Sequence, residues 1–303
     1  MYMFLFNWLV VIVIVQLSDN CYRQGPKMKI ICAGLQKTGT KTMAQALRIL
    51  GYNVHDVFEQ FFYEKELWNK VLENSASVKD YQKFLGEIDA VMDWPAVAVW
   101  EQIMEAFPDA KIILTVRSTE DEWYESMKKH FEVANQYVTM NENLLRILLL
   151  FAGPLAREFN KTQRAFIPAC LGLPVMYGSH TETFLRSRYR QHNLYVKSIC
   201  PNEKLLIYNV KDGWKPLCDF LNVGYPDTPF PRENIKSDMI HKLLNNKWEH
   251  DCGFQSRMDR QIRQFSGIFL VGYFSGGIFI SKGTLPGLAT EDTLLQVYRY
   301  YQA

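Results

Sequence analysis

Short apolar runs alternate with longer segments of helical periodicity through the middle of the chain. Runs of three to six residues bounded by polar or glycine positions are typical of strands buried on both faces. The runs that predict strands are 29–33, 52–54, 90–92, 111–116 and 205–210. Strands separated by helices favour a parallel sheet covered on both faces, so the pattern predicts an α/β fold.

The segments between these runs space their apolar residues by three or four positions, which is typical of amphipathic helices. The predicted helices are 42–50, 59–73, 78–86, a segment from Pro95 to Phe107, a segment from Thr119 through Met127, and 214–221. Gly51 is suited to ending the first of them, and Pro95 is suited to the first turn of another. Thr119 is a favourable N-cap residue.

Residues 131–180 break this rhythm. They are rich in aromatic and apolar side chains and contain Pro154, Pro168 and Pro174. We interpret them as an insertion that forms a lid or an acceptor pocket. The residues that would line it are Phe131, Tyr137, Leu144, Leu148, Phe151, Phe159, Phe166 and Tyr177. Such side chains equally suit plain packing, so they indicate only a mild preference for an apolar or aromatic ligand.

Three polar or glycine residues follow predicted strands directly. Gly34 follows the first strand, Asp93 follows the strand at 90–92, and Arg117 follows the strand at 111–116. Ligands of parallel sheets bind beyond the carboxyl ends of the strands. We therefore predict that these residues meet at one edge of the sheet, although an ion pair at the surface would also explain Arg117.

The loop after the first strand has the composition of a phosphate-binding turn. It reads Gly34-Leu35-Gln36-Lys37-Thr38-Gly39-Thr40-Lys41-Thr42, and a predicted helix follows. Glycine lets the backbone approach a phosphate, and amides at a helix start point toward it. A nucleotide kinase or NTPase would show GxxxxGK[ST], but Thr40 stands between Gly39 and Lys41 here. The alternative is a tight turn whose lysine binds nothing.

Both ends of the chain are strongly apolar. Met3 to Leu17 carries no charge, and a second apolar stretch runs from Phe265 to Ile280. Basic residues follow the first stretch and precede the second, which would keep the middle of the chain in the cytosol. We therefore divide the chain into a possible anchor at 1–27, a main domain at 28–240, and a C-terminal region at 241–303 with its own possible anchor. A soluble cytoplasmic protein with buried end segments is the alternative.

Charge and cysteine content narrow the function. The chain has 303 residues and a formal net charge of +2, and because no segment is dominated by Lys and Arg we expect no nucleic-acid partner. The six cysteines are far apart and form no CxxC pair, so a metal site or a dense disulfide framework is not expected. Buried thiols in a reduced compartment are the favoured interpretation, and bridges in a secreted protein are the alternative.

Several motifs together resemble one protein family. The motifs are the Lys37-Thr38-Gly39-Thr40 loop, Asp93-Trp94-Pro95, residues 107–117, residues 123–126, residues 208–218 with Phe220 and Leu221, and Pro229, Pro231 and Asn234. They resemble the P-loop sulfotransferases, in the branch of bacteria, fungi and invertebrates that includes the parasite enzyme activating oxamniquine. The resemblance covers about residues 29–236. Ser118 departs from it, since that branch often has Asp after the arginine.

The resemblance implies a three-layer α/β fold of the P-loop NTPase type, with a central parallel sheet and a mostly helical insertion. It also implies transfer of the sulfuryl group of 3′-phosphoadenosine-5′-phosphosulfate to an acceptor hydroxyl by in-line attack, a scheme that needs no metal. Rival interpretations are a P-loop nucleotide kinase or NTPase, and a non-catalytic, membrane-tethered member of the fold.

The same resemblance implies a role for each motif residue. Lys37 would stabilise charge on the leaving phosphate. Thr38, Gly39, Thr40, Lys41 and Thr42 would hold the 5′-phosphate, and Arg117 and Ser126 the 3′-phosphate. Asp93 would be the general base for the acceptor hydroxyl. A helix N-cap is an alternative role for Asp93 that does not exclude the first.

Overall fold

The computed structural model describes residues 28–137, 154–172 and 181–232, with short pieces at 252–253, 256–257 and 260–261. Both predicted membrane anchors, at 1–27 and within 241–303, lie outside these ranges. Among the described residues, no helix combines the length and the apolar character needed to cross a bilayer.

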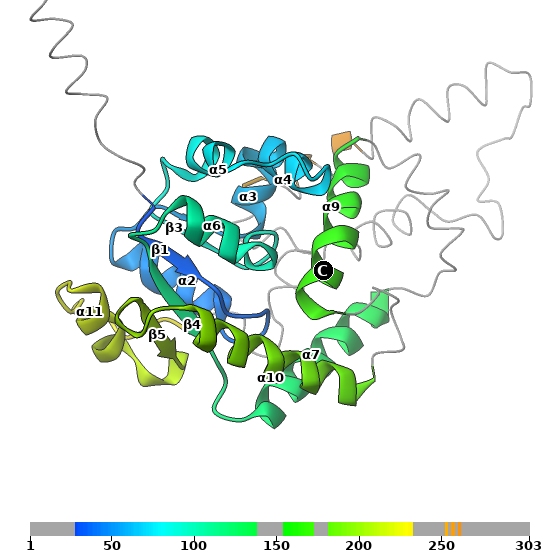
Figure 1. Ribbon diagram of the computed structural model, residues 1–303. Helices are drawn as coiled ribbons and strands as arrows, with labels where there is room; N and C mark the ends of the chain where they lie inside the picture. The colour runs from blue at the N-terminus through cyan, green and yellow to red at the C-terminus, as the bar shows by residue number, and fades with distance from the viewer. Residues whose placement is uncertain are drawn as a thin grey trace, which may run out of the picture.

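Five parallel strands form one sheet in the order β2-β3-β1-β4-β5 (Figure 1). The strands are β1 (Ile30–Cys32), β2 (Val54–His55), β3 (Ala90–Met92), β4 (Lys111–Thr115) and β5 (Leu205–Tyr208). The first strand, β1, lies at the centre, with Ile30 opposite Ala90 on one side and Lys111 on the other. The residues that follow β1, β3 and β4 therefore emerge side by side, as the sequence predicts.

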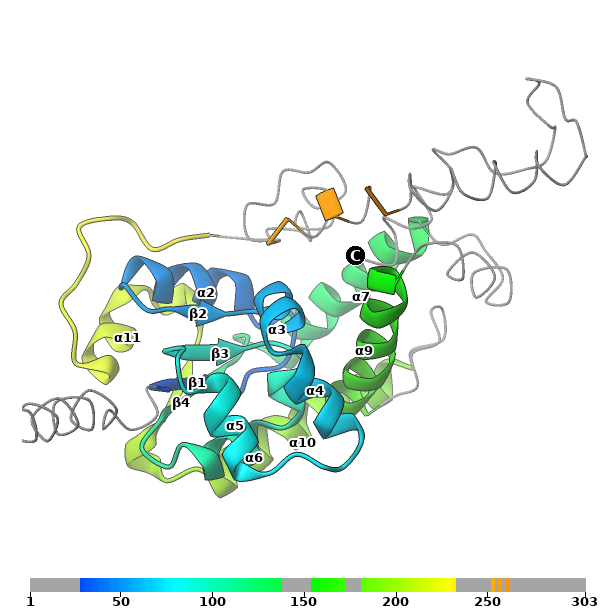
Figure 2. The same ribbon diagram turned by 90° about the horizontal axis from the view of Figure 1, so that it is seen from above.

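Alternate residues of the strands point into two separate apolar clusters, which makes three layers (Figure 2). Ile31, Val91 and Ile112 face one side. That side is covered by α3 (Val57–Tyr63), α4 (Lys65–Leu72), α5 (Val78–Leu85), α6 (Trp100–Ala106), α7 (Glu120–Tyr137), α9 (Pro154–Leu171) and α10 (Glu182–Ile199). Ile30 and Cys32 face the opposite side, which is covered by α2 (Thr40–Ile49) and α11 (Trp214–Leu221). The predicted three-layer fold is confirmed.

Two predicted elements are divided in the structure. The helix expected at 59–73 is two helices, because the carboxylate of Glu64 turns inward to His55 Nδ1 at 2.8 Å and α3 ends there. The helix expected after Pro95 starts as a short 3₁₀ turn, η1 (Ala96–Ala98), before α6. A buried polar contact therefore places the break at Glu64, which hydrophobic spacing alone does not reveal.

The strand expected at 205–210 ends at Tyr208. A second 3₁₀ turn, η2 (Asn202–Lys204), precedes it, and a third, η3 (Val210–Asp212), follows. The side-chain oxygen of Asn209 accepts from the Lys211 amide at 3.0 Å and so caps η3. The chain thereby turns away from the sheet edge two residues earlier than the apolar pattern suggests.

The described part of segment 131–180 is helical. The segment begins inside α7, which is capped as expected by the Thr119 hydroxyl accepting from the Glu122 amide at 3.1 Å. The second helix, α9, contains Pro168. The helical character is as predicted, and the lid function stays a prediction.

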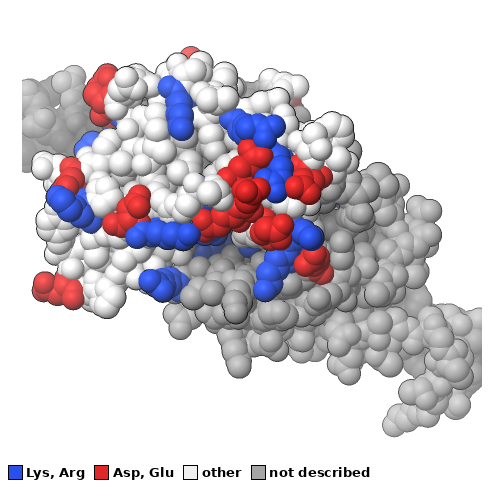
Figure 3. All heavy atoms as spheres, turned by 90° about the horizontal axis from the view of Figure 1, so that it is seen from below, with Lys and Arg blue, Asp and Glu red and all other residues white. Residues whose placement is uncertain are grey.

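Helix α10 was not predicted, because its few buried apolar residues are interspersed with arginines. Its arginines pair with acidic residues of the first turn of α7. Arg186 lies 2.5 Å from Asp121, and Arg190 lies 2.6 Å from Glu120. Basic and acidic side chains are accordingly mixed on the face seen from below (Figure 3). These pairs fix α7 and α10 against each other.

The cysteines Cys32, Cys170, Cys200 and Cys218 are buried and have free thiols. Burial raises the pKa of each, to about 11 for Cys200, so these thiols stay protonated and unreactive near neutral pH. This agrees with the expected scattered thiols.

Candidate active site

A cavity of about 1070 Å³ opens beyond the carboxyl ends of β1, β3 and β4. Residues from several widely separated parts of the sequence line it. Of the predicted site residues, those that line it are Lys37, Gly39, Thr40, Lys41, Thr42, Asp93, Arg117 and Ser126. The fold thus brings together all of the predicted residues except Thr38.

Thr38 holds the loop in place from the inside. Its side chain is fully buried, and its hydroxyl donates to the Leu35 carbonyl at 2.6 Å and pairs with the Thr115 hydroxyl at 2.6 Å. Gly34 allows this close approach to β4, because a Cβ there would lie 1.9 Å from the Thr115 hydroxyl oxygen. Thr38 therefore shapes the loop and does not line the cavity.

Gly39 makes the turn from the loop into α2. Its φ of 101° lies in the left-handed region, and a Cβ would lie 2.7 Å from a Val210 methyl group. The helix begins at the next residue, so the amides of Thr40, Lys41 and Thr42 have no carbonyl one turn earlier to bond. Such a helix start favours an anion.

Lys37 lies in the loop at a left-handed φ of 68° and lines the cavity. Burial and the neighbouring Arg117 guanidinium lower the pKa of Lys37 to about 8, although Asp93 acts in the opposite direction. The free protein therefore holds this ammonium in a place where positive charge is costly. A bound anion would relieve that cost.

Arg117 is tied to the phosphate loop. Its Nε donates to the Lys37 carbonyl at 2.7 Å, and its Nη1 lies 3.3 Å from Glu122 Oε1. Glu122 also pairs with Lys211 at 2.9 Å. Arg117 is thus fixed on the cavity wall. The alternative interpretation, a simple ion pair at the surface, does not account for its bond to the loop.

Trp123 explains one of the sequence motifs. Its side chain is fully buried, its Nε1 donates to the Gln36 carbonyl at 2.9 Å, and its ring stacks on Tyr189 with centroids 4.5 Å apart. The Tyr189 hydroxyl accepts from the Arg117 amide at 3.0 Å. Trp123 and Tyr189 therefore position both the loop and Arg117.

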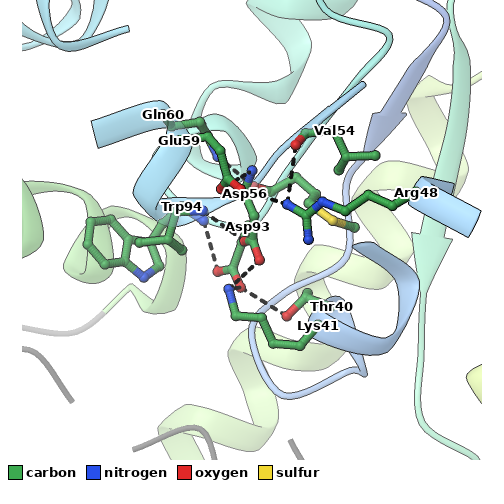
Figure 4. A network of polar contacts seen from close by, with 11 residues as sticks. Thr40, Lys41, Arg48, Val54, Asp56, Glu59, Gln60, Asp93 and Trp94 are labelled. Atoms are coloured by element: carbon green, nitrogen blue, oxygen red, sulfur yellow. Dashed lines mark hydrogen bonds and ion pairs between the residues drawn. The ribbon is translucent and has the colours of Figure 1, made fainter. Parts of the chain in front are cut away.

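Asp93 lies at the end of β3 with a left-handed φ of 60° and is 4% exposed (Figure 4). Its Oδ1 accepts from the Trp94 amide at 2.9 Å, and its Oδ2 accepts from the Thr40 hydroxyl at 2.9 Å. Burial raises the pKa of Asp93, and the nearby Lys41 opposes this. Its carboxylate bonds the next amide in the chain and does not cap η1, where Pro95 holds the cap position.

The cavity also contains residues that the sequence did not single out. Lys211 and Arg232 add positive charge, while Phe58 and Ile167 form an apolar wall beside Trp94, together with the predicted Phe159. The only sequence signal for Lys211 was its place within the motif at 208–218. Of the predicted acceptor-pocket residues, Phe159 lines the cavity, and Phe131 and Phe166 pack in the core. The side chains of the other five lie outside the described residues.

Two histidines lie close to the loop. His130 lines the cavity, and burial together with Lys37 lowers its pKa to about 3. His192 is buried on α10, where its Nε2 donates to the Ala33 carbonyl at 2.6 Å and burial lowers its pKa to about 4. Both imidazoles are therefore neutral near neutral pH, and His192 supports the end of β1.

The C-terminal closing segment forms a further wall. Pro229, Phe230 and Pro231 line the cavity. Trp214 Nε1 donates to the Thr228 carbonyl at 2.7 Å, and the Trp214 and Phe230 rings meet edge to face at 4.8 Å. Trp214 thus anchors this segment and does not itself line the cavity. Within the described ranges, no group of three His, Cys, Asp or Glu residues is placed to hold a metal ion.

Comparison with known proteins agrees with this geometry. The family described as "Sulfotransferase domain" matches residues 29–239, which contain every residue of the predicted site. The chain is also 27% identical over 272 residues to "Ava biosynthesis cluster protein M" of Aspergillus versicolor, an alignment that covers 86% of this chain and 99% of that protein. The chain therefore belongs to the sulfotransferase domain family, whose general activity is sulfuryl transfer.

Proposed function

We propose that the cavity binds 3′-phosphoadenosine-5′-phosphosulfate and transfers its sulfuryl group to the hydroxyl of a small-molecule acceptor. The observation that carries this proposal is that one cavity brings together Lys37, Asp93 and Arg117, which follow three strands, and Ser126 of α7. Membership of the sulfotransferase family supports the reaction class.

The donor's two phosphate groups would occupy the basic side of the cavity. The amides at the start of α2, including that of Thr40, and the hydroxyl of Thr42 would hold the 5′-phosphate. Arg117 and Ser126 would hold the 3′-phosphate, with the guanidinium offering a planar pair of donors. Lys211 is a further cation on this wall.

Transfer would proceed by in-line attack. The acceptor oxygen forms a bond to sulfur as the bond between sulfur and the bridging oxygen breaks, which releases adenosine 3′,5′-bisphosphate. Lys37 would stabilise the charge that collects on the leaving oxygen, and Asp93 would take the acceptor's proton. Phosphoryl transfer follows the same logic of position and fixed positive charge.

The acceptor would enter along the apolar wall. Phe58, Trp94 and Phe159 are clustered there, with the rings of Trp94 and Phe159 5.7 Å apart. Asp93 adjoins Trp94 in the chain. An apolar or aromatic alcohol fits this wall better than a highly charged acceptor does.

A kinase or NTPase is the rival from another reaction class. Its loop lysine would reach the outer phosphates of ATP. Here Lys41, the lysine nearest to that register, lies with its ammonium against Asp56 and Asp93. This arrangement favours the proposed donor over ATP.

The decisive measurement is a calorimetric titration of the protein with adenosine 3′,5′-bisphosphate and, separately, with ATP and Mg²⁺. We expect the bisphosphate to bind at least about 10-fold more tightly, because Arg117 and Ser126 would contact a second phosphate that ATP does not present at that position. Equal affinity, or a preference for ATP, would overturn the proposed donor.

Binding of the bisphosphate should take up a proton near pH 8. Lys37 has a pKa of about 8 in the free protein, and a bound phosphate would raise it. The affinity for the bisphosphate should therefore fall as pH rises through this pKa, because a neutral Lys37 must first be protonated. Titrations at pH 8 in buffers of different ionisation enthalpy should give an uptake of about half a proton. Lys37→Met should abolish the uptake, and an unchanged value in this variant would assign the proton elsewhere.

A further inference from the structure

Lys41 is buried between two carboxylates, one of which has no assigned role. Its Nζ lies 2.5 Å from Asp56 Oδ2 and 3.5 Å from Asp93 Oδ2, and the side chain is 6% exposed (Figure 4). Burial opposes a charged lysine, yet the two carboxylates raise the pKa of Lys41 above its usual value. Lys41 is therefore an ammonium ion that the two aspartates share.

Asp56 is held rigidly by the helix that follows it. Its Oδ1 accepts from the Val57 amide at 2.8 Å as the N-cap of α3, and Glu59 completes the capping box from the first turn. Glu59 is fixed in turn by Arg48 at 2.8 Å. The second oxygen of Asp56 thus has a fixed position facing Lys41.

The charged groups around Asp93 come from several elements. The Asp93 carboxylate interacts electrostatically with Lys37 in the loop, Lys41 on α2 and Asp56 at the start of α3. Neutral thiols lie nearby, with Cys170 on α9 close to Asp93 and Cys32 on β1 close to Asp56. Among these groups Asp56 opposes the pairing of Asp93 with Lys41, because it attracts the same ammonium.

We propose that Asp56 is a positioning residue that draws the Lys41 ammonium away from Asp93, leaving the Asp93 carboxylate free to receive the acceptor's proton. This inference rests on the proposed role of Asp93. In this arrangement the Lys41 side chain pairs with carboxylates and does not make the expected phosphate contact. The backbone amide of Lys41 can still bind the phosphate.

The test is Asp56→Asn, because asparagine keeps the N-cap and removes only the charge. Lys41 then pairs with Asp93 alone, and the Asp93 carboxylate becomes a weaker base. We expect the acid limb of kcat to move to lower pH by about one unit, plateau kcat to fall about 3- to 10-fold, and the affinity for adenosine 3′,5′-bisphosphate to stay within about 2-fold.

Two further variants sharpen the test. Lys41→Met removes the cation from both carboxylates and should move the acid limb in the opposite direction, to higher pH. Glu59→Gln is the matched control, since it removes a charge from the same capping box without a contact to Asp93; it should leave the profile in place. A profile for Asp56→Asn that coincides with wild type, moves upward, or is reproduced by Glu59→Gln would overturn the inference.

A readout without turnover separates this inference from the proposed function. In protein labelled with ¹³C-carboxyl aspartate, the Asp93 resonance is the one that Asp93→Asn removes. It should titrate at lower pH in Asp56→Asn than in wild type, whichever reaction the protein catalyses. An unshifted titration would contradict the sharing of Lys41. If the Asp93 titration moves to lower pH as expected but the protein transfers no sulfuryl group, only the proposed function is contradicted.

Discussion

Lys37→Ala is expected to lower kcat by about 10²- to 10³-fold, corresponding to ~3 kcal/mol of lost transition-state stabilisation. The physical reason is that the Lys37 ammonium would meet charge that develops only as the bond between sulfur and the leaving oxygen breaks. Much of the binding of adenosine 3′,5′-bisphosphate should remain, because in the proposed site the amides of α2, Ser126 and Arg117 would contact it independently. Single-turnover rates and calorimetric affinities measure the two effects separately.

Lys215→Met provides the matched control for this experiment. Lys215 is an exposed lysine on α11, paired with Asp219 at 2.9 Å, and it does not line the cavity. Its loss should leave both kcat and affinity unchanged. Turnover by Lys37→Ala equal to that of wild type would remove Lys37 from the chemical step.

Asp93→Asn is expected to abolish most turnover, by about 10²- to 10⁴-fold, while the affinity for the bisphosphate is kept. Asparagine has the size of aspartate and can still accept from the Trp94 amide. It cannot take a proton from the acceptor hydroxyl. In wild type, kcat should fall as pH drops through the raised pKa of Asp93, because only the ionised carboxylate acts as a base.

Asp109→Asn is a suitable control, since Asp109 is an exposed residue in the turn before β4. Activity retained by Asp93→Asn would remove Asp93 as the base. The neutral imidazole of His130, which also lines the cavity, would then be the next residue to test.

The local pattern of the sequence was sufficient for most elements. Strands β1, β3 and β4 lie within one residue of their predicted bounds, because a short apolar run between polar residues is typical of a strand buried on both faces of a sheet. The division at Glu64 was not predictable, since it depends on a contact with His55 that forms only when α3 packs beside β2.

The site shows the same division between local and tertiary information. Glycine, threonine and lysine in one loop, with single polar residues at strand ends, account for seven of the eight predicted residues that line the cavity, and the resemblance to a family added Ser126. Thr38 was predicted to bind the 5′-phosphate because a hydroxyl in such a loop can donate to a phosphate oxygen. Only the approach of Thr115, 77 positions away, turns that hydroxyl inward.

The sequence by itself determined the five strands and most of the helices between them, the phosphate-type loop and the polar residues at the strand ends, because these depend on neighbours within a few positions. The tertiary structure alone decided that Asp56 and Asp93 share Lys41, that Glu122 serves both Arg117 and Lys211, and that Phe230 closes the cavity. Charge sharing and desolvation depend on distances between segments far apart in the chain, which no local pattern contains.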